Sequence, residues 1–256
     1  MTRIHPTAVI NPKAEIGEDC EIGPYCVIGE HVALGPGCRL ISHVVIDGHT
    51  RLGRENSIYP FASIGLRTQD LKWKGGLTRT EIGDQNTIRE YVSIHSATGD
   101  GEATVIGSMN TILAGSHIGH NVIMGNKCIV SMAALAGHVT MEDCALVGGM
   151  SAVHQFCRVG TMAITGGVSK IVQDVPPYML VDGNPAVVKA LNKVGLERNG
   201  VSEEAQTALK QAQRILFREG NAIPNALAKI EAQVAGLPEI QRLVNFVRTS
   251  ERGITR

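Results

Sequence analysis

The first quarter of the chain is built on a six-residue repeat. Neither common period explains it, because a helix repeats its apolar face about every 3.6 residues and a strand every 2. Glycine often follows the repeated aliphatic, and a small residue usually stands four positions after it. The repeated aliphatics are Ile4, Ile10, Ile16, Ile22, Ile28, Leu34, Leu40, Ile46, Leu52, Ile58 and Ile64. This hexapeptide repeat predicts a parallel β-helix, in which each coil buries its aliphatics against its neighbours.

The same phase continues through most of the chain, with one slip. It resumes at Ile82 and reaches Val130, a five-residue step leads to Leu135, and the new phase runs to Ile171. Three hexads make one triangular coil, so residues roughly 18 apart stack at about 4.8 Å, the spacing of hydrogen-bonded strands. We therefore place the β-helix at residues 1–183.

Two polar stretches interrupt the repeat. Residues 66–80 contain the only tryptophan and are predicted to project as a loop, and residues 97–103 form a smaller excursion. Insertions in a solenoid map to one face, and polar loops on a rigid scaffold often carry function. We expect function at these departures rather than in the regular coils.

Residues 184–256 show a helical pattern instead. Ser202 is a suitable N-cap with Gly220 after the last turn, and Pro224 and Pro238 open two further amphipathic segments. The segment carries 11 Lys/Arg and 7 Asp/Glu, an excess of four positive charges in a chain of zero formal charge. This basic end is either a set of ordinary solvated helix faces or a docking surface for an acidic partner.

Composition excludes several classes of function. Basic and acidic residues number 24 each, so bulk charge gives no case for nucleic acid or an anionic membrane as partner. The repeat begins at once without an apolar run of signal-peptide length. No segment approaches the ~20 apolar residues of a membrane span. We expect a cytoplasmic protein with no integral membrane segment.

The cysteines follow the repeat. Five of the six occupy the small inward position, where cysteine behaves as a small hydrophobe, and Cys144 is one residue out of phase. The five are Cys20, Cys26, Cys38, Cys128 and Cys157. We interpret them as core residues rather than as disulfides or metal ligands.

The coil arithmetic brings four histidines together. Ile118, Leu135 and Val153 occupy one column of three successive coils, and each has histidine beside it or within three residues. The four histidines are His117, His120, His138 and His154. They fall within about 10 Å by strand spacing. Such a cluster suits a neutral imidazole acting as general base while others hold phosphate or sugar oxygens. It also suits three imidazoles that bind Zn²⁺ and leave a position open for water.

The spacing in the cluster disfavours the metal. Left-handed β-helix carbonic anhydrases use a more widely spaced histidine pair than His117 and His120, which are separated by two residues. No strand–turn–helix elbow carries a serine nucleophile. Direct transfer of a group from a donor to an acceptor, without a covalent enzyme intermediate, a metal or a cofactor, is the simplest mechanism.

Specific motifs extend from the projecting loop to the C-terminus. They are Gln69-Asp70-Leu71-Lys72, Ser116-His117-Ile118-Gly119-His120, Leu135-Ala136-Gly137-His138, Ala152-Val153-His154-Gln155-Phe156-Cys157, Val172-Gln173-Asp174-Val175-Pro176-Pro177-Tyr178 and Thr249-Ser250-Glu251-Arg252-Gly253. With them the chain resembles the acyl-[acyl-carrier-protein]–UDP-N-acetylglucosamine O-acyltransferases, which open lipid A biosynthesis. The resemblance implies an all-β left-handed parallel β-helix followed by a small C-terminal α-helical domain. It also implies a homotrimer with active sites in the clefts between subunits.

The resemblance further implies a reaction and its residues. A 3-hydroxyacyl chain moves from acyl carrier protein to the 3-position of the UDP-amino sugar, with no cofactor. His120 is the general base, and the backbone N–H of Gly137 stabilises the developing oxyanion. The residues implied in substrate binding are Gln69, Asp70, His117, His138 and His154 for sugar and phosphates, Lys72 near the phosphopantetheine or the nucleotide phosphate, Gly167 for acyl-chain length, and Asn192 and Arg198 for the nucleotide.

The sequence departs from the family pattern at several positions. Asn121 follows the base where the family commonly has aspartate, and Val194 and Asn199 replace a usual glutamate and a usual second arginine. Gly119 and residues 181–185 resemble a branch in which some members act on a 3-amino sugar. The acceptor therefore stays open between the 3-hydroxy sugar and its 3-amino analogue.

Two other functions remain distinguishable by experiment. A zinc hydratase of the γ-carbonic-anhydrase type predicts stoichiometric metal in the purified protein, and a non-enzymatic scaffold predicts no binding of UDP-sugars.

Overall fold

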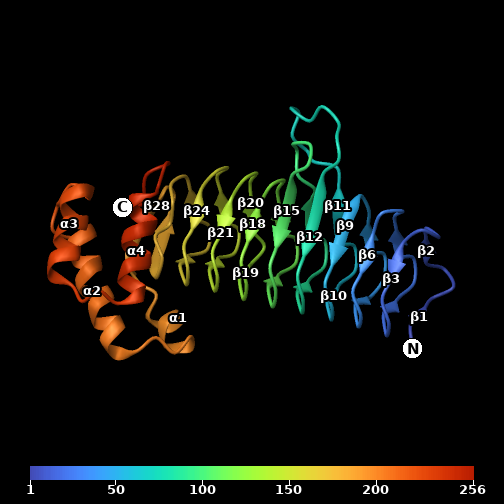
Figure 1. Cartoon of the computed structure of the whole chain (residues 1–256), viewed down its shortest axis with the longest axis horizontal. Helices are drawn as coiled ribbons and strands as arrows, with labels where there is room; N and C mark the ends of the chain where they lie inside the picture. The colour runs from blue at the N-terminus through green and yellow to red at the C-terminus, as the bar shows by residue number, and fades with distance from the viewer.

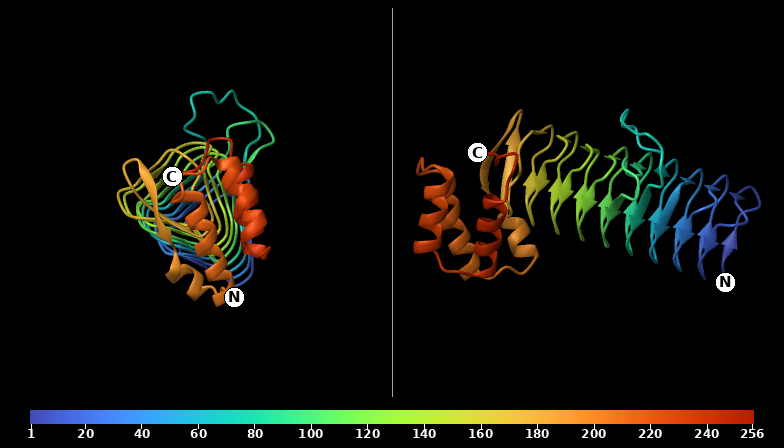
Figure 2. Two further views of the ribbon diagram at one scale, coloured as in Figure 1. Left: turned by 90° about the vertical axis from the view of Figure 1, so that its left-hand side faces the viewer. Right: turned by 45° about the horizontal axis from the view of Figure 1, so that its top comes forward.

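A computed structural model describes residues 1–256, most of which form a left-handed parallel β-helix (Figure 1). Short strands stack in three sheets that make the faces of a prism, seen nearly end-on in Figure 2. The C-terminal helices lie at the opposite end of the molecule from the N-terminus. The fold class predicted from the repeat is confirmed.

Each turn of the chain contributes one strand to each sheet. The first sheet orders β1 (Arg3–Ile4), β4 (Glu21–Ile22), β7 (Arg39–Leu40), β10 (Ser57–Ile58), β13 (Thr87–Ile88), β16 (Thr111–Ile112), β19 (Ile129–Val130), β22 (Leu146–Val147), β25 (Ile164–Thr165), β27 (Met179–Gly183) and β28 (Ala186–Leu191). The second orders β2 (Val9–Ile10), β5 (Val27–Ile28), β8 (Val45–Ile46), β11 (Ser63–Leu66), β14 (Ser93–His95), β17 (His117–Ile118), β20 (Ala134–Leu135), β23 (Ala152–Val153) and β26 (Lys170–Ile171). The third orders β3 (Glu15–Ile16), β6 (Ala33–Leu34), β9 (His49–Leu52), β12 (Arg79–Ile82), β15 (Ala103–Ile106), β18 (Ile123–Met124), β21 (Thr140–Met141) and β24 (Arg158–Val159). All neighbours are parallel except β27 and β28, which form an antiparallel pair.

The hexad aliphatics stack in register inside the prism. Ile58 pairs with Leu40 on one side and with Ile88 on the other, although the second step in sequence is longer. The extra residues leave the prism between β11 and β12, where residues 67–78 project (Figure 1), so the loop is slightly shorter at both ends than the 66–80 expected from the sequence. The shorter excursion of residues 97–103 leaves between β14 and β15. After the first interruption β12 pairs in register with β9 and β15, whereas the pairing of β11 with β14 shifts after Ile64.

The cysteines pack as predicted. Cys20, Cys26, Cys38, Cys128 and Cys157 are buried and none is in a disulfide. Burial raises the pKa of the Cys128 thiol to about 12 and that of Cys157 to about 11. A thiol with so high a pKa is a poor nucleophile at neutral pH, which agrees with a structural role.

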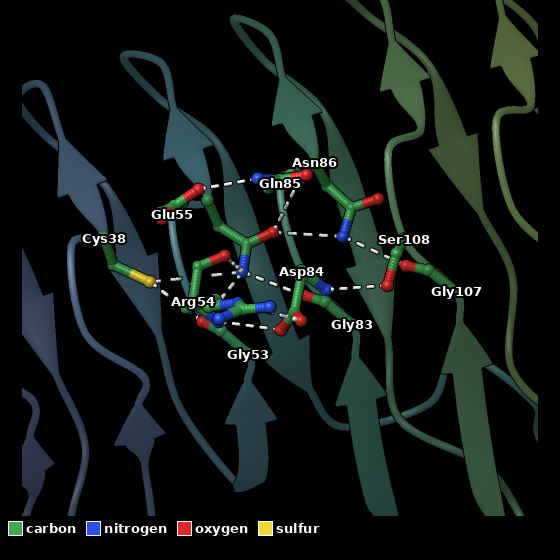
Figure 3. Close-up of polar contacts among 11 residues, drawn as sticks. Cys38, Gly53, Arg54, Glu55, Gly83, Asp84, Gln85, Asn86, Gly107 and Ser108 are labelled. Atoms are coloured by element: carbon green, nitrogen blue, oxygen red, sulfur yellow. Dashed lines mark hydrogen bonds and ion pairs between the residues drawn. The ribbon is translucent and has the colours of Figure 1, made fainter.

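Buried asparagines replace the small residues of one inner column in the middle coils. Asn56, Asn86 and Asn110 are at most 1% exposed. Nδ2 of Asn86 donates to Oδ1 of Asn56 (3.0 Å) and to the carbonyl of Gly107 (3.0 Å), so that one amide joins three successive coils (Figure 3). The backbone N–H of Cys128 donates to Oδ1 of Asn110 at 2.7 Å. A buried amide costs stability unless it is hydrogen-bonded, so this ladder favours one stacking register.

The five-residue step shortens one corner of the prism. Met132 has a left-handed φ of 43° at this corner, as other corner residues do. The Ser116 hydroxyl donates to the carbonyl of Val130 (3.3 Å) and accepts from the N–H of Ala133 (3.4 Å). Ile118 still pairs with Leu135, as the coil arithmetic required. The missing residue is therefore absorbed locally.

Four helices follow the prism: α1 (Lys193–Arg198), α2 (Glu203–Phe217), α3 (Ile223–Gln233) and α4 (Pro238–Arg248). The Ser202 hydroxyl caps α2 by accepting from the N–H of Ala205 at 3.2 Å, and proline lies in the first turns of α3 and α4. These predicted helix starts are confirmed. No helix has both the length and the apolar character needed to cross a bilayer.

Polar contacts fix the helices to the last coils. Asp174 is 1% exposed, and its carboxylate accepts from the N–H of Arg158 (2.8 Å) and from the Ser250 hydroxyl (2.7 Å). The Arg158 guanidinium lies 4.0 Å from the centre of the Phe246 ring, a cation–π contact. Prism and helices are thus joined by buried charge as well as by apolar packing.

Candidate active site

A cleft of about 780 Å³ lies between the projecting loop and the second sheet. Its walls come from the loop, from β17, β20, β23 and β26, and from the corners that follow β17 and β20. Seven of the sequence-predicted site residues line it: Gln69, Asp70, Lys72, His117, His120, Gly137 and His154. Residues separated by up to 85 positions in the chain are therefore brought to one cavity.

His120 lies at the centre of the polar groups. Its side chain is 16% exposed, and its Nε2 atom lies 3.8 Å from Oδ2 of Asp70 on the loop. Its Nδ1 atom lies 3.0 Å from Oδ1 of Asn121. A Cβ atom added to Gly137 would overlap the His120 ring. Glycine at position 137 therefore lets the imidazole lie directly against the backbone of the next coil.

Two further imidazoles lie deeper in the cleft. His117 Nδ1 hydrogen-bonds the Ser93 hydroxyl at 2.8 Å, and the His117 ring packs edge-on to His95 with ring centres 5.2 Å apart. Burial lowers the pKa of both histidines, and the nearby His120 lowers each further. Both are therefore neutral at pH 7, and a neutral imidazole can donate from one ring nitrogen and accept at the other.

His95 is a cleft residue that the sequence reasoning missed. It is 6% exposed and lines the cavity. The signal was present, because His95 follows Ile94, and Ile94 pairs with Ile118 in the column that located the other histidines. Extending the column by one coil toward the N-terminus would have found it.

His138 supports His120 rather than lining the cavity. The two rings meet edge-on with centres 5.1 Å apart, and His138 stacks on Phe156 at 4.7 Å. Burial lowers the pKa of His138, and the neighbouring His120 lowers it further. His154 lies on the next coil and lines the cavity, with Nδ1 3.1 Å from the carbonyl of Gln155.

Hydrogen bonds hold the loop residues over the cleft. The backbone N–H of Lys72 donates to Oδ1 of Asp70 (2.9 Å), and the N–H of Asp70 donates to the Thr68 hydroxyl (3.1 Å). The Thr68 hydroxyl in turn meets that of Thr98 at 2.8 Å. The two interruptions of the repeat are therefore tied together above the histidines.

Three predicted residues lie away from this cavity within the chain. Gly167 lies at a corner near Gly149, whose carbonyl would be 3.3 Å from an added Cβ. Asn192 caps α1 through a bond from the N–H of Gly195 (3.0 Å), and Arg198 is exposed at the end of that helix.

The donor set does not match a zinc site. No group of three or more histidine, cysteine, aspartate or glutamate side chains is placed to hold one metal ion. The cleft instead contains the His120 imidazole, with Nε2 facing the cavity, the backbone N–H of Gly137 beside it, and two lysines, Lys72 and Lys170. Together with the β-helix, this arrangement defines the class of hexapeptide-repeat acyltransferases.

Comparison with known proteins identifies the family. Residues 174–255 match the model described as UDP N-acetylglucosamine O-acyltransferase, domain 2, and residues 1–30 match that of the bacterial transferase hexapeptide repeats. The chain is 42% identical to LpxA from Acinetobacter baumannii over 99% of both chains, with a TM-score of 0.95. It is 39% identical to LpxA from Bacteroides fragilis, a UDP-N-acetylglucosamine acyltransferase, over 99% of this chain and 100% of that one, with a TM-score of 0.96. The Arabidopsis UDP-N-acetylglucosamine acyltransferase is 35% identical over 99% of this chain and 100% of that one, with a TM-score of 0.88. The chain belongs to the UDP-N-acetylglucosamine acyltransferase family, the LpxA family, as the sequence motifs predicted.

Proposed function

We propose that this enzyme transfers a 3-hydroxyacyl chain from acyl carrier protein to the 3-position of UDP-N-acetylglucosamine, the first step of lipid A biosynthesis, in the cytoplasm. The observation that carries the proposal is the His120 imidazole, whose Nε2 edge lies in the cleft beside Asp70 and Gly137. A general base must lie within hydrogen-bond reach of the proton that it removes. An acceptor hydroxyl bound against Nε2 of His120 would meet that condition.

The proposed step is a direct acyl transfer. His120 Nε2 takes the proton of the acceptor hydroxyl. The hydroxyl oxygen attacks the thioester carbon at the same time, and the C–O bond forms. The Gly137 N–H stabilises the oxyanion, since donors aimed at developing charge lower the barrier most. The C–S bond then breaks, and the proton passes from His120 to the leaving thiolate. No enzyme-bound acyl group is needed.

The other cleft residues are assigned to binding. Neutral His117 and the loop residues Gln69 and Asp70 offer donors and acceptors to the sugar, and Lys72 supplies positive charge for a phosphate. His138 positions the base by its edge-on contact, and His154 contacts the substrate farther along the cleft. Gly167 is assigned to the limit on acyl-chain length, and Asn192 and Arg198 are assigned to binding of the nucleotide. These three residues would join the cleft of a neighbouring subunit.

An exposed apolar stripe supports the proposed homotrimer. The corner between the first and second sheets carries Tyr25, Phe61, Tyr91, Met132, Met150 and Val168, all 48–71% exposed. A row of exposed apolar side chains marks an interaction site, and this row borders the second sheet, which lines the cleft. A subunit packed on it would close the open side of the cleft. Sedimentation equilibrium tests this: wild type is expected as a trimer, and Phe61→Asp with Met150→Asp is expected to dissociate it, whereas a wild-type monomer would contradict it.

The 3-amino sugar is the second candidate acceptor. The observation that favours it is Asn121, because a neutral amide beside His120 stabilises imidazolium less than a carboxylate does, and an amine needs a weaker base than a hydroxyl. Incubation with 3-hydroxyacyl carrier proteins of several chain lengths and each acceptor, followed by mass analysis, separates the two. Equal or better use of the 3-hydroxy sugar would rule out the amine preference, and no transfer to either would overturn the proposal.

A further inference from the structure

The Asn121 side chain forms a bridge between His120 and a carboxylate on the second interruption of the repeat. Its Oδ1 atom lies 3.0 Å from His120 Nδ1 and accepts from the backbone N–H of Thr98 at 3.0 Å. Its Nδ2 atom donates to Oε2 of Glu102 at 2.6 Å. Glu102 lies in residues 97–103, the excursion that no binding role has explained.

These partners fix which way the amide points. A backbone N–H can only donate, so the Asn121 atom that faces Thr98 must be the oxygen. A carboxylate accepts, so the atom that faces Glu102 must be the NH₂ group. A flipped amide would place two donors against each other at Thr98 and two acceptors against each other at Glu102. Both ends of the amide therefore require the same orientation.

The orientation of Asn121 determines the tautomer of His120. Because Oδ1 is an acceptor, the His120 nitrogen that faces it, Nδ1, must carry the proton. The lone pair is then on Nε2, the atom that faces Asp70 and the cleft. We propose that Glu102 is a positioning residue that, through the Asn121 amide, holds His120 in the tautomer able to accept a proton at Nε2. This inference rests on the proposed role of His120 as general base.

The surrounding loop is built to hold Glu102 at this point. Oε2 of Glu102 also accepts from the N–H of Gly99 at 2.9 Å, and a Cβ atom on Gly99 would meet the carboxylate carbon at 2.5 Å. Gly101 has a left-handed φ of 75°, which glycine adopts without strain. The carbonyl of Glu102 accepts from the N–H of Arg79 at 3.0 Å. Two glycines therefore permit a tight turn that presents the carboxylate to Asn121.

The relay also accounts for the departure from the family pattern at position 121. An aspartate there would meet Glu102 as a second carboxylate, and like charges at hydrogen-bond distance repel. Asparagine with glutamate, or aspartate with glutamine, gives one donor and one acceptor at this contact. The donor and acceptor of this pair can thus be exchanged while the hydrogen bond between the two side chains is kept, and that exchange is the test.

The experiment measures kcat and KM for Glu102→Ala, Asn121→Asp, the double variant Glu102→Gln with Asn121→Asp, and His120→Ala. Asp100→Asn is the matched control, because Asp100 lies in the same loop but contacts the N–H of Leu77 rather than Asn121. Circular dichroism and sedimentation check that each variant is folded and assembled like wild type. Hydrogen-bond partners that orient metal-ligating imidazoles are worth about 10–100-fold in affinity or activity, and the lower end of that range is expected for an imidazole that acts as a base. We expect kcat to fall about tenfold in Glu102→Ala, with KM unchanged. We expect the same for Asn121→Asp, because repulsion between the introduced carboxylate and Glu102 outweighs the stronger stabilisation of imidazolium by a carboxylate.

The double variant separates a positioning role from a structural one. It restores the donor–acceptor match between the two side chains, because the introduced glutamine amide can donate to the introduced carboxylate. The rescue is expected to be partial, since that NH₂ group then faces the Gly99 N–H, for which Oε2 of Glu102 is the acceptor in the wild type. Its kcat is therefore expected to exceed that of Asn121→Asp clearly, while Asp100→Asn stays at the wild-type rate. If His120→Ala abolishes transfer but Glu102→Ala and Asn121→Asp keep wild-type kcat, the relay is wrong and the general base stands. A double variant no better than Asn121→Asp also overturns the relay. Substantial activity in His120→Ala would instead overturn the general base, and the inference with it.

Discussion

The regular coils before residue 66 and the interrupted coils after it use the same backbone for different purposes. In the regular coils the outward side chains form ion pairs along the sheets, as between Arg39 and Glu21, or stack at the corners, as His31 does on His49 at 4.2 Å. In the interrupted coils the corners carry His120, Asn121 and His138, and the loops bring Asp70 and Glu102 to them. The repeat therefore supplies a rigid frame, and the departures from it carry the residues of the proposed chemistry.

The largest contrast is expected between histidines of the two regions. His120→Ala removes the proposed base, and general bases contribute about 10²–10⁴-fold, so kcat should fall by that range while the protein stays folded. His31→Ala, in the regular coils, should leave kcat unchanged. The measurement is steady-state transfer with both variants at equal protein concentration. A His120→Ala variant with a rate close to wild type would remove the distinction between the regions.

Substitution of glycine by alanine should also have different effects in the two regions. A Cβ on Gly137 overlaps the movable His120 ring, so Gly137→Ala should displace the base and lower kcat by about 10²-fold with little change in stability. A Cβ on Gly17 would lie 2.7 Å from backbone atoms of residues 35 and 36, which cannot move aside. Gly17→Ala should instead destabilise by about 1–3 kcal/mol, the usual cost of overpacking, with normal kcat in the folded enzyme. Urea unfolding and kinetics on both variants check the pair, and the reverse pattern would contradict this division.

The ladder of buried asparagines should stabilise the coils that carry the two interruptions. Asn86→Ala leaves the buried N–H of Asn110 without its acceptor and removes the amide donor to the carbonyl of Gly107, while Oδ1 of Asn56 keeps only the backbone N–H of residue 86. The free energy of unfolding should therefore fall by about 2–3 kcal/mol. Asn126 is exposed, and Asn126→Ala should change it by no more than about 0.5 kcal/mol. Chemical denaturation of the two variants gives the comparison. Equal effects would mean that the ladder does not hold the register.

The smallest expected effect is a pH dependence of stability that arises in the interrupted coils. Burial lowers the pKa of His95 and His117 in the folded protein, so the unfolded chain binds protons at a higher pH than the folded one does. Stability is therefore full above the usual imidazole pKa, near 6.5, and declines as the pH falls below it. The free energy of unfolding should be lower at pH 5.5 than at pH 7.5, and His117→Gln should reduce that difference. An unchanged difference in the variant would show that His117 is not one of the groups responsible.

The fold was predictable because a six-residue repeat of aliphatic residues is typical of a parallel β-helix. The six-residue period located the strands, the inward cysteines and, through the five-residue step, the pairing of Ile118 with Leu135. The column then placed His117, His120 and His154 in one cleft. His95 was missed only because the column was not followed back to Ile94.

The contacts made by the loops could not be predicted in the same way. Residues 66–80 and 97–103 have no repeat, so no arithmetic places Asp70 3.8 Å from His120 or Glu102 2.6 Å from Asn121. These contacts follow from hydrogen bonds between the loops, such as that of Thr68 with Thr98. The substitution at Asn121 was visible in the sequence, but its partner was not.

The most direct test of the central claim is the mass of the UDP-sugar after incubation with wild-type enzyme and a 3-hydroxyacyl carrier protein. We expect the sugar to gain one 3-hydroxyacyl group as an ester in the wild-type reaction and to stay unmodified with His120→Ala. An unmodified sugar in the wild-type reaction, with the carrier protein still fully acylated, would contradict the claim.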